Sequence, residues 1–324
     1  MSEELKEKLA GIGAFVPLVT PATPDYEVDI PRFREQVRFV MDGGIKGKTG
    51  ALLAAGGGGE GYFLNDEEWY AVIKAFAEEA AGKVTTMAGV FELSTKNAIR
   101  KIKFAEDLGI DLIQLAPPHY EKPTDIEVYT HYKMINDAVS KVGIMLYHTY
   151  WAFPEYYEMT TPLFKKIAEL DHIVGIKWAS ARFRNFLDVL FGFQGRFIFE
   201  DNQGWMQLLG EAKGMHGTTM WIGNYIPETA ARLIKLIQKG DIQQFAKEAR
   251  EANALRNAVA EEIAALAYGT SATGEFGTLG EGSSGKTIMK LVGRPCGPPF
   301  PPQIEPTPEQ LEEIRARLEK RGLL

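Results

Sequence analysis

The alternation of short apolar segments with amphipathic helical segments constrains the fold of this chain more than any other feature of its sequence. Eight apolar segments have the pattern of strands, and a helical pattern follows each of them. The helical patterns include a proline start at Pro31 and a serine N-cap at Ser94. The eight expected strands are residues 14–21, 50–56, 83–90, 111–117, 142–147, 173–178, 196–200 and 216–221.

Eight strand and helix units are the number that closes a (β/α)8 barrel, or TIM barrel. The nearly continuous apolar character of the strands fits a parallel sheet that helices cover on both faces. An open doubly wound sheet is the alternative, because a strand count is easily wrong by one. The sequence therefore predicts an α/β fold of the TIM-barrel class.

The composition changes after about residue 240. Residues 241–268 are rich in Ala and Glu and predict one long helix, and a glycine-rich loop follows over residues 269–285. Prolines gather in residues 293–308, and residues 308–321 predict a charged helix. We expect a barrel domain over residues 1–240 that carries the active site, and C-terminal helices over residues 241–324 that pack on the barrel.

Charge and cysteine content limit the possible partners and compartments. The 324 residues carry a formal charge of −7, which disfavours a nucleic-acid or anionic membrane surface. The one cysteine, Cys296, cannot form an intrachain disulfide and fits a reducing compartment. The sequence shows no apolar signal core and no apolar stretch of 18 residues, and its five histidines lack metal-ligand spacing. We expect a cytoplasmic protein without metal, nucleic-acid or membrane partners.

Reactive side chains fall at the carboxyl ends of the expected strands, where barrels carry their active sites. Lys177 lies near the end of the sixth strand, and burial would favour the free amine that attacks a carbonyl. Tyr147 lies at the same level of the fifth strand, and Tyr120 follows the fourth. A phenol beside an amine suits proton transfer during chemistry next to an iminium. A rim lysine paired with a carboxylate is the structural alternative.

Four consecutive glycines follow the second expected strand. The backbone N–H groups of Gly57, Gly58 and Gly59 can reach an anion such as a substrate carboxylate, because no side chain intervenes. We expect a threonine to be tolerated at Gly58 and a proline to weaken binding.

These residues lie in motifs that resemble a known family. AFVPLVTP, GGGGEGYFLNDEE, LAPPHYEKPT followed by His131, LYHTYW and GIKWAS are similar, in this order, to signatures of the dihydrodipicolinate synthase and N-acetylneuraminate lyase family of class I aldolases. The resemblance implies Lys177 as the Schiff-base lysine, Tyr147 as the acid/base tyrosine, and Tyr120 as a relay residue across an oligomer contact. It also implies a pyruvate-like 2-keto acid substrate, a homotetramer or dimer, and no cofactor.

Two departures bear on the substrate. Gly57 and Gly58 stand where the synthases usually have two threonines, and no arginine follows Tyr147. Dihydrodipicolinate synthesis itself is thereby disfavoured, while the glycine pair resembles keto-deoxy sugar acid dehydratases. Tyr150, Trp151, Trp178 and Trp221 instead suggest the broad aromatic pocket of hydratase-aldolases that cleave aryl-substituted pyruvates. The further substrate-binding candidates are His148, Trp178, Ser180 and Asn224.

The preferred hypothesis is a lyase that forms an iminium on Lys177 and then cleaves a C–C or C–O bond. The alternatives are dihydrodipicolinate synthase proper and a barrel that binds a keto acid or sugar acid without turnover. Residues 280–287 also match the phosphate-binding loop pattern GxxxxGK[ST], but no strand is predicted before them. We therefore expect the start of a short helix there.

Overall fold

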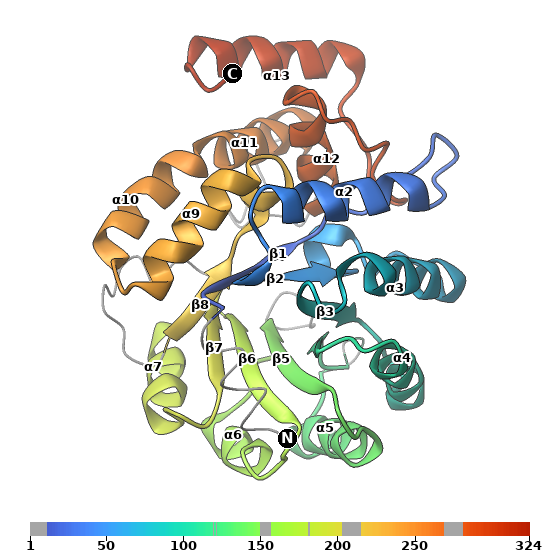
Figure 1. Cartoon of the computed structure of the whole chain (residues 1–324), viewed down its shortest axis with the longest axis vertical. Helices are drawn as coiled ribbons and strands as arrows, with labels where there is room; N and C mark the ends of the chain where they lie inside the picture. The colour runs from blue at the N-terminus through green and yellow to red at the C-terminus, as the bar shows by residue number, and fades with distance from the viewer. Residues whose placement is uncertain are drawn as a thin grey trace.

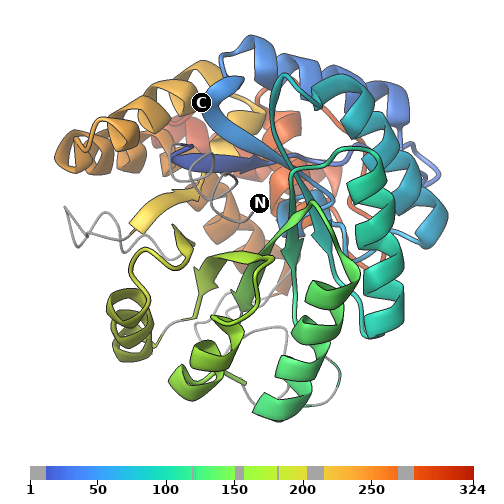
Figure 2. The ribbon, with the colours of Figure 1, turned by 60° about the horizontal axis from the view of Figure 1, so that its bottom comes forward.

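The computed structural model describes residues 12–118, 120, 122–149, 157–180, 182–202, 215–268 and 281–324. Eight parallel strands close into one barrel in chain order, with the helices outside (Figures 1 and 2). The (β/α)8 prediction is therefore confirmed. The strands are β1 (Ala14–Pro17), β2 (Gly47–Ala54), β3 (Val84–Val90), β4 (Leu112–Leu115), β5 (Gly143–Thr149), β6 (Ile173–Ala179), β7 (Ile198–Asp201) and β8 (Met215–Thr219).

Most of the helices around the barrel, α2 to α6, begin at polar side-chain caps that the sequence supplies. Ser94 accepts the N–H of Asn97, as expected, and Asn65 forms a reciprocal capping box with Glu68. Their bounds are α2 (Ile30–Asp42), α3 (Asp66–Ala80), α4 (Thr95–Asp107), α5 (Asp125–Ala138), α6 (Thr161–Ile167), α7 (Phe183–Gly192) and α9 (Pro227–Gln238), with short 3-10 turns η1 (Gly57–Gly59) and η3 (Trp221–Asn224). No helix in the described ranges is both long and apolar enough to cross a membrane.

The C-terminal helices differ from the prediction at two points. The single helix expected over residues 241–268 is two helices, α10 (Ile242–Ala252) and α11 (Ala254–Tyr268). Asn253 separates them, and its side chain donates to the carbonyl oxygen of Ala249 at 2.8 Å, a local bond that competes with a continuous helix. The expected glycine-rich loop also ends early, because α12 (Glu281–Leu291) begins inside it.

The C-terminal helices pack on the barrel through a separate apolar cluster. Val19 and Trp221 from the barrel join Val259 of α11, Ile288 of α12 and Ile314 of α13 (Pro308–Lys320) in this cluster. Figure 1 shows these three helices together at one side of the molecule, beyond α2 and α9. The first turn of α12 thereby lies against η1, the glycine turn that follows β2.

The inside of the barrel is apolar at one level and polar at another. Phe15, Met87, Met145 and Ile198 belong to the buried cluster within the strands. Tyr147, Lys177 and Glu200 lie further toward the carboxyl ends of their own strands. The apolar layer thus supports a buried polar group at the end where barrels perform chemistry.

Candidate active site

Lys177 lies inside the barrel between two reactive neighbours. The register of the sheet pairs it with Tyr147 of β5 on one side and with Glu200 of β7 on the other. Its Nζ atom is 4.3 Å from the centre of the Tyr147 ring and 5.4 Å from the centre of the Phe15 ring. Only 5% of the residue is exposed. The structure therefore brings together the lysine and tyrosine that the sequence singled out.

The surroundings of Lys177 favour its uncharged form. Burial lowers the pKa of the amine, while the charges of Glu200 and Glu281 raise it and that of Arg256 lowers it. The pKa is lower than usual on balance. A lowered pKa increases the fraction of the amine that carries a free lone pair at a given pH, and the free lone pair is the requirement for attack on a carbonyl carbon.

Glu200 is a site residue that the sequence analysis missed. Burial raises its pKa to about 8, and Lys177 and the hydroxyl of Thr219 only partly oppose this rise. Thr219 Oγ1 donates to Glu200 Oε1 at 2.8 Å, whereas Glu200 Oε2 has no hydrogen-bond partner in the described part of the chain. The sequence could have indicated Glu200, because Glu200 and Lys177 lie near the ends of adjacent strands, and the register of the sheet pairs them.

Tyr147 stays a neutral phenol at rest. Burial and then the charge of Glu281 raise its pKa well above the usual value. The ring of Phe91 packs edge-on against it at 6.4 Å between centres. The phenol is therefore fixed beside the amine and holds its proton.

The glycine turn offers two backbone donors. The N–H groups of Gly59, Glu60 and Gly61 bond to carbonyl oxygens within the turn. No hydrogen bond among the described residues uses the N–H of Gly57 or Gly58. These two neighbouring donors fit the expected carboxylate contact.

Two side chains from elsewhere fill the space beside the glycine pair. A Cβ atom added at Gly57 would lie 2.9 Å from Glu281 Oε2, and one at Gly58 would lie 2.9 Å from Trp221 Cδ1. The expectation that a threonine is tolerated at Gly58 is therefore corrected, since the indole ring is packed in the core and cannot retreat freely.

His148 and Trp178 face away from the barrel interior. Their rings lie 4.4 Å apart and pack against Phe164 of α6, and Trp178 also contacts Phe186 of α7. Successive strand residues point to opposite faces, so these neighbours of Tyr147 and Lys177 point outward. The expectation that they contact substrate is corrected, because strands and helices enclose both rings.

The polar candidates Ser180 and Asn224 are engaged within the protein. Asn224 Nδ2 donates to the carbonyl oxygens of Pro17 at 2.8 Å and Trp221 at 2.9 Å, and its Oδ1 accepts the N–H of Val19 at 2.9 Å. Ser180 Oγ donates to Glu158. Asn224 thus holds the end of β1 in place, and its expected role in substrate binding stays a prediction.

Tyr120 and the aromatic candidates after the fifth strand do not belong to the buried group that the structure describes. Tyr120 is 79% exposed, in contrast to the buried Lys177 and Tyr147. Tyr150 and Trp151 lie outside the described residues. The aromatic pocket proposed from the sequence therefore remains a prediction.

The phosphate-loop pattern of residues 280–287 forms the start of α12 from Glu281 onward. Lys286 Nζ lies 2.7 Å from Glu60 Oε2 and donates to the carbonyl oxygen of Pro298 at 2.8 Å, so it is committed to a buried ion pair. A Cβ atom at Gly282 would lie 2.0 Å from Glu60 Oε1, and one at Gly285 would lie 2.7 Å from Trp221 Cζ2. Close packing explains both glycines without a phosphate.

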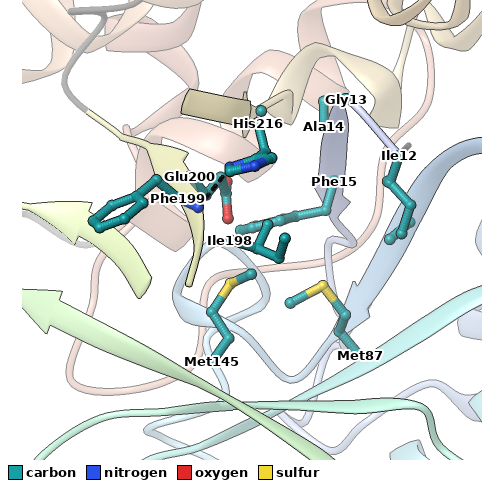
Figure 3. A pocket seen from close by; sticks show the side chains of 12 residues that line it. Ile12, Gly13, Ala14, Phe15, Met87, Met145, Ile198, Phe199, Glu200 and His216 are labelled. Atoms are coloured by element: carbon teal, nitrogen blue, oxygen red, sulfur yellow. Dashed lines mark hydrogen bonds between the residues drawn. The ribbon is translucent and has the colours of Figure 1, made fainter. Parts of the chain in front are cut away.

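A pocket lies on the amino-terminal side of the apolar layer inside the barrel, and Glu200 is the member of the reactive group that lines it. Its lining includes Ile12, Met87, Met145 and His216, and Glu200 reaches it from above the apolar layer (Figure 3). His216 Nδ1 accepts the N–H of Phe199 at 3.1 Å. Neither Lys177 nor Tyr147 lines it, and barrels bind substrate at the other end.

No group of three metal-ligating side chains occurs in the described part of the chain.

The fold and this site define a barrel of the class I aldolase type, and the comparisons with known proteins agree. The model of the dihydrodipicolinate synthetase family matches residues 10–273. The chain therefore belongs to the dihydrodipicolinate synthetase family, and it is an enzyme of the class I aldolase-type lyases.

Similar proteins cover most of the chain. The 4-hydroxy-tetrahydrodipicolinate synthase of Rhodopseudomonas palustris is 31% identical over 231 residues, 71% of this chain and 75% of that protein. The synthase of Methanopyrus kandleri is 29% identical and covers 96% and 97%. The solved dihydrodipicolinate synthase of Acinetobacter baumannii, complexed with pyruvate, has a TM-score of 0.76 at 24% identity and covers 97% and 100%. At that identity the structural likeness supports the fold alone.

Proposed function

We propose that this enzyme binds a pyruvate-like 2-keto acid as an iminium on Lys177 and cleaves a C–C or C–O bond of the bound molecule. The observation that carries the proposal is the buried Lys177 amine with a lowered pKa, packed against the Tyr147 phenol. The family match and the relatives named as 4-hydroxy-tetrahydrodipicolinate synthases support the substrate class.

The chemistry follows from the groups present. The lone pair of Lys177 forms a bond to the keto carbon, and the keto oxygen leaves as water after it gains protons. The positive iminium nitrogen then draws an electron pair from the adjacent carbon, so that a bond to that carbon can break. Tyr147 is placed to transfer protons in these steps because it packs on the amine.

The glycine turn is the proposed site for the substrate carboxylate. The N–H groups of Gly57 and Gly58 are the donors, and their turn is buried at the same end of the barrel. Charge-assisted bonds from two N–H groups orient the keto carbon toward Lys177. This arrangement supports a substrate that carries its carboxylate next to the keto group.

The second part of the substrate distinguishes this chain from the synthases. No arginine follows Tyr147 to receive a further carboxylate, and the glycine pair replaces the hydroxyls of the loop. We favour a keto-deoxy sugar acid or a substituted pyruvate over the condensation that the named relatives perform. A panel of such acids, scored for pyruvate release against water loss, separates aldol cleavage from dehydration.

The iminium is tested by borohydride reduction in the presence of pyruvate. The expected result is a covalent adduct on Lys177, found by mass spectrometry of peptides, and its loss in Lys177→Ala. Lys165→Ala, which changes an exposed lysine of α6, is the matched control and keeps the adduct. An unmodified Lys177 with full turnover contradicts the mechanism. Binding of a keto acid without adduct or product would instead favour the non-catalytic barrel.

The proposed assembly is a homo-oligomer in which a second copy covers Tyr120. The support is an aromatic residue that is 79% exposed in the single chain. Light scattering after size exclusion is expected to give a dimer or tetramer for the wild-type chain. A wild-type monomer with full activity would contradict this assembly.

A further inference from the structure

The indole ring of Trp221 lies with its nitrogen beside the glycine turn η1. A Cβ atom added at Gly58 would lie 2.9 Å from Cδ1 and 3.0 Å from Nε1 of this ring. The benzene half of the indole packs on α12, since a Cβ atom at Gly285 would lie 2.7 Å from Cζ2. Asn224 Nδ2 donates to the carbonyl oxygen of Trp221 at 2.9 Å and holds the residue in η3. Contacts on both sides of the ring therefore fix the position of its nitrogen.

The indole N–H of Trp221 has no acceptor in the described part of the protein. The indoles of Trp69 and Trp178 donate to the carbonyl oxygens of Gly89 at 2.9 Å and Ser180 at 3.1 Å, and no such bond is made by Trp221. Trp221 is 6% exposed, and its Nε1 is not one of the described side-chain atoms that are sealed from solvent without a partner. A bound molecule can therefore reach this donor.

The nitrogens of Trp221 and Gly58 are close enough to bind one group together. A Cβ atom lies about 2.5 Å from the backbone nitrogen of its own residue, so Trp221 Nε1 lies within about 5.5 Å of the Gly58 nitrogen. An oxygen accepts hydrogen bonds over about 2.9 Å, so one oxygen can accept from two nitrogens that are up to about 5.8 Å apart. A single carboxylate at the turn can therefore receive both N–H groups.

A carboxylate at this turn has a negative neighbour. Glu281 Oε2 lies 2.9 Å from the position of a Cβ atom at Gly57. Because like charges repel, a substrate carboxylate needs donors that offset this repulsion. A side-chain donor beside Gly58 favours binding on that side of the turn. The indole N–H suits this role because it only donates and does not titrate.

We propose that the indole N–H of Trp221 binds the carboxylate of the 2-keto acid together with the backbone N–H of Gly58. This inference rests on the function proposed above for Lys177 and the glycine turn. The glycine at position 58 admits the ring, and the ring supplies the turn with a side-chain donor. Trp221 thereby becomes a residue that selects substrates with a carboxylate next to the keto group.

The test measures the pyruvate concentration that half-saturates borohydride trapping on Lys177 in wild type and in Trp221→Phe. Phenylalanine keeps an aromatic ring and has no donor. The loss of one hydrogen bond to a charged group is expected to raise the half-saturating concentration by about 10- to 100-fold. The trapping rate at saturating pyruvate is expected to stay within about threefold of wild type, because the bond is present before and after the iminium forms.

Tyr225→Phe is the matched control. The centre of the Tyr225 ring lies 6.0 Å from that of Trp221, and its buried hydroxyl has no partner among the described residues. This variant changes a neighbour of the indole and leaves the indole N–H in place. Its pyruvate dependence is expected to match that of wild type.

Two further measurements separate hydrogen bonding from packing. Methyl pyruvate lacks the negative carboxylate, so Trp221→Phe is expected to change its half-saturating concentration by less than about threefold. A benzothiophene, introduced as 3-benzothienylalanine at position 221, has nearly the shape of the indole and carries sulfur in place of N–H. It is expected to weaken pyruvate binding as phenylalanine does, and it provides the test if Trp221→Phe does not fold.

The outcomes distinguish this inference from the proposed function. If wild type forms no adduct on Lys177, the proposed function fails. If wild type forms the adduct but removal of the indole N–H leaves the half-saturating pyruvate concentration within about twofold, Trp221 is not a donor to the substrate. Equal weakening of pyruvate and methyl pyruvate, or weakening by phenylalanine and not by benzothiophene, would show that the ring acts through packing and would overturn the inference.

Discussion

Replacing Glu200 by glutamine tests whether a protonated carboxyl group lies beside Lys177. The carboxyl is 3% exposed, and only one of its oxygens has a hydrogen-bond partner among the described residues. Burial raises its pKa from 4.5 to about 8. The folded protein therefore binds a proton at Glu200 that the unfolded chain releases at much lower pH.

The direction in which the free energy of unfolding changes with pH follows from the difference between the folded and unfolded pKa values of Glu200. A raised pKa gives stability that is complete below pH 4.5 and is lost as the pH rises through about 8. Each pH unit of this window costs roughly 1.4 kcal/mol, so the total loss from this group over the rise in pKa from 4.5 to about 8 is about 5 kcal/mol. Glutamine has the same shape and does not ionise, so Glu200→Gln is expected to lack this loss.

The assay is urea unfolding of both proteins at closely spaced pH values from 4.5 to 9. The wild-type free energy of unfolding is expected to fall relative to that of Glu200→Gln across this window, and the gap should level off above pH 8. Glu67→Gln, at an exposed position of α3, is expected to follow the wild-type curve. Parallel curves for wild type and Glu200→Gln would refute the protonated carboxyl.

The remaining predictions concern packing around the site. Lys286→Met leaves the buried carboxylate of Glu60 without its cation and is expected to lower the free energy of unfolding by about 3 to 5 kcal/mol, measured in urea. Gly58→Thr places a Cβ atom 2.9 Å from Trp221 and should cost about 1 to 3 kcal/mol, whereas an unchanged midpoint would show that the indole moves. Asn224→Ala should lower the melting temperature but keep borohydride trapping on Lys177, and a loss of trapping at full stability would place Asn224 in the site.

The sequence predicted the barrel well because its signals are local. Each strand is a short apolar run, and caps such as Ser94 mark helix starts within a few residues. Lys177 and Tyr147 were found for the same reason, since strand ends share one face of a barrel. The break at Asn253 was missed because a side-chain bond to Ala249 ends α10 within a pattern that otherwise continues.

The outward orientation of His148 and Trp178, and the position of Glu200, could have been predicted from the alternation of side chains along a strand. If Lys177 points into the barrel, the alternation of strand side chains turns Trp178 toward the helices, and the same holds for Tyr147 and His148. The structure shows both rings packed against Phe164. Glu200 could likewise have been aligned with Lys177 by counting from the strand ends.

The reason for glycine at positions 57 and 58 could not be predicted from any local sequence pattern. Gly57 and Gly58 differ from the threonines of the synthases, and this difference alone suggests that the site has lost groups. The structure shows that Glu281 and Trp221, more than 160 residues further along the chain, fill the same space. Gly282 and Gly285 admit Glu60 and Trp221 in turn, so the glycines on both segments are needed for α12 to approach the turn. The absent side chains and the helix that replaces them therefore form one arrangement, and a change at either segment should be judged with the other in place.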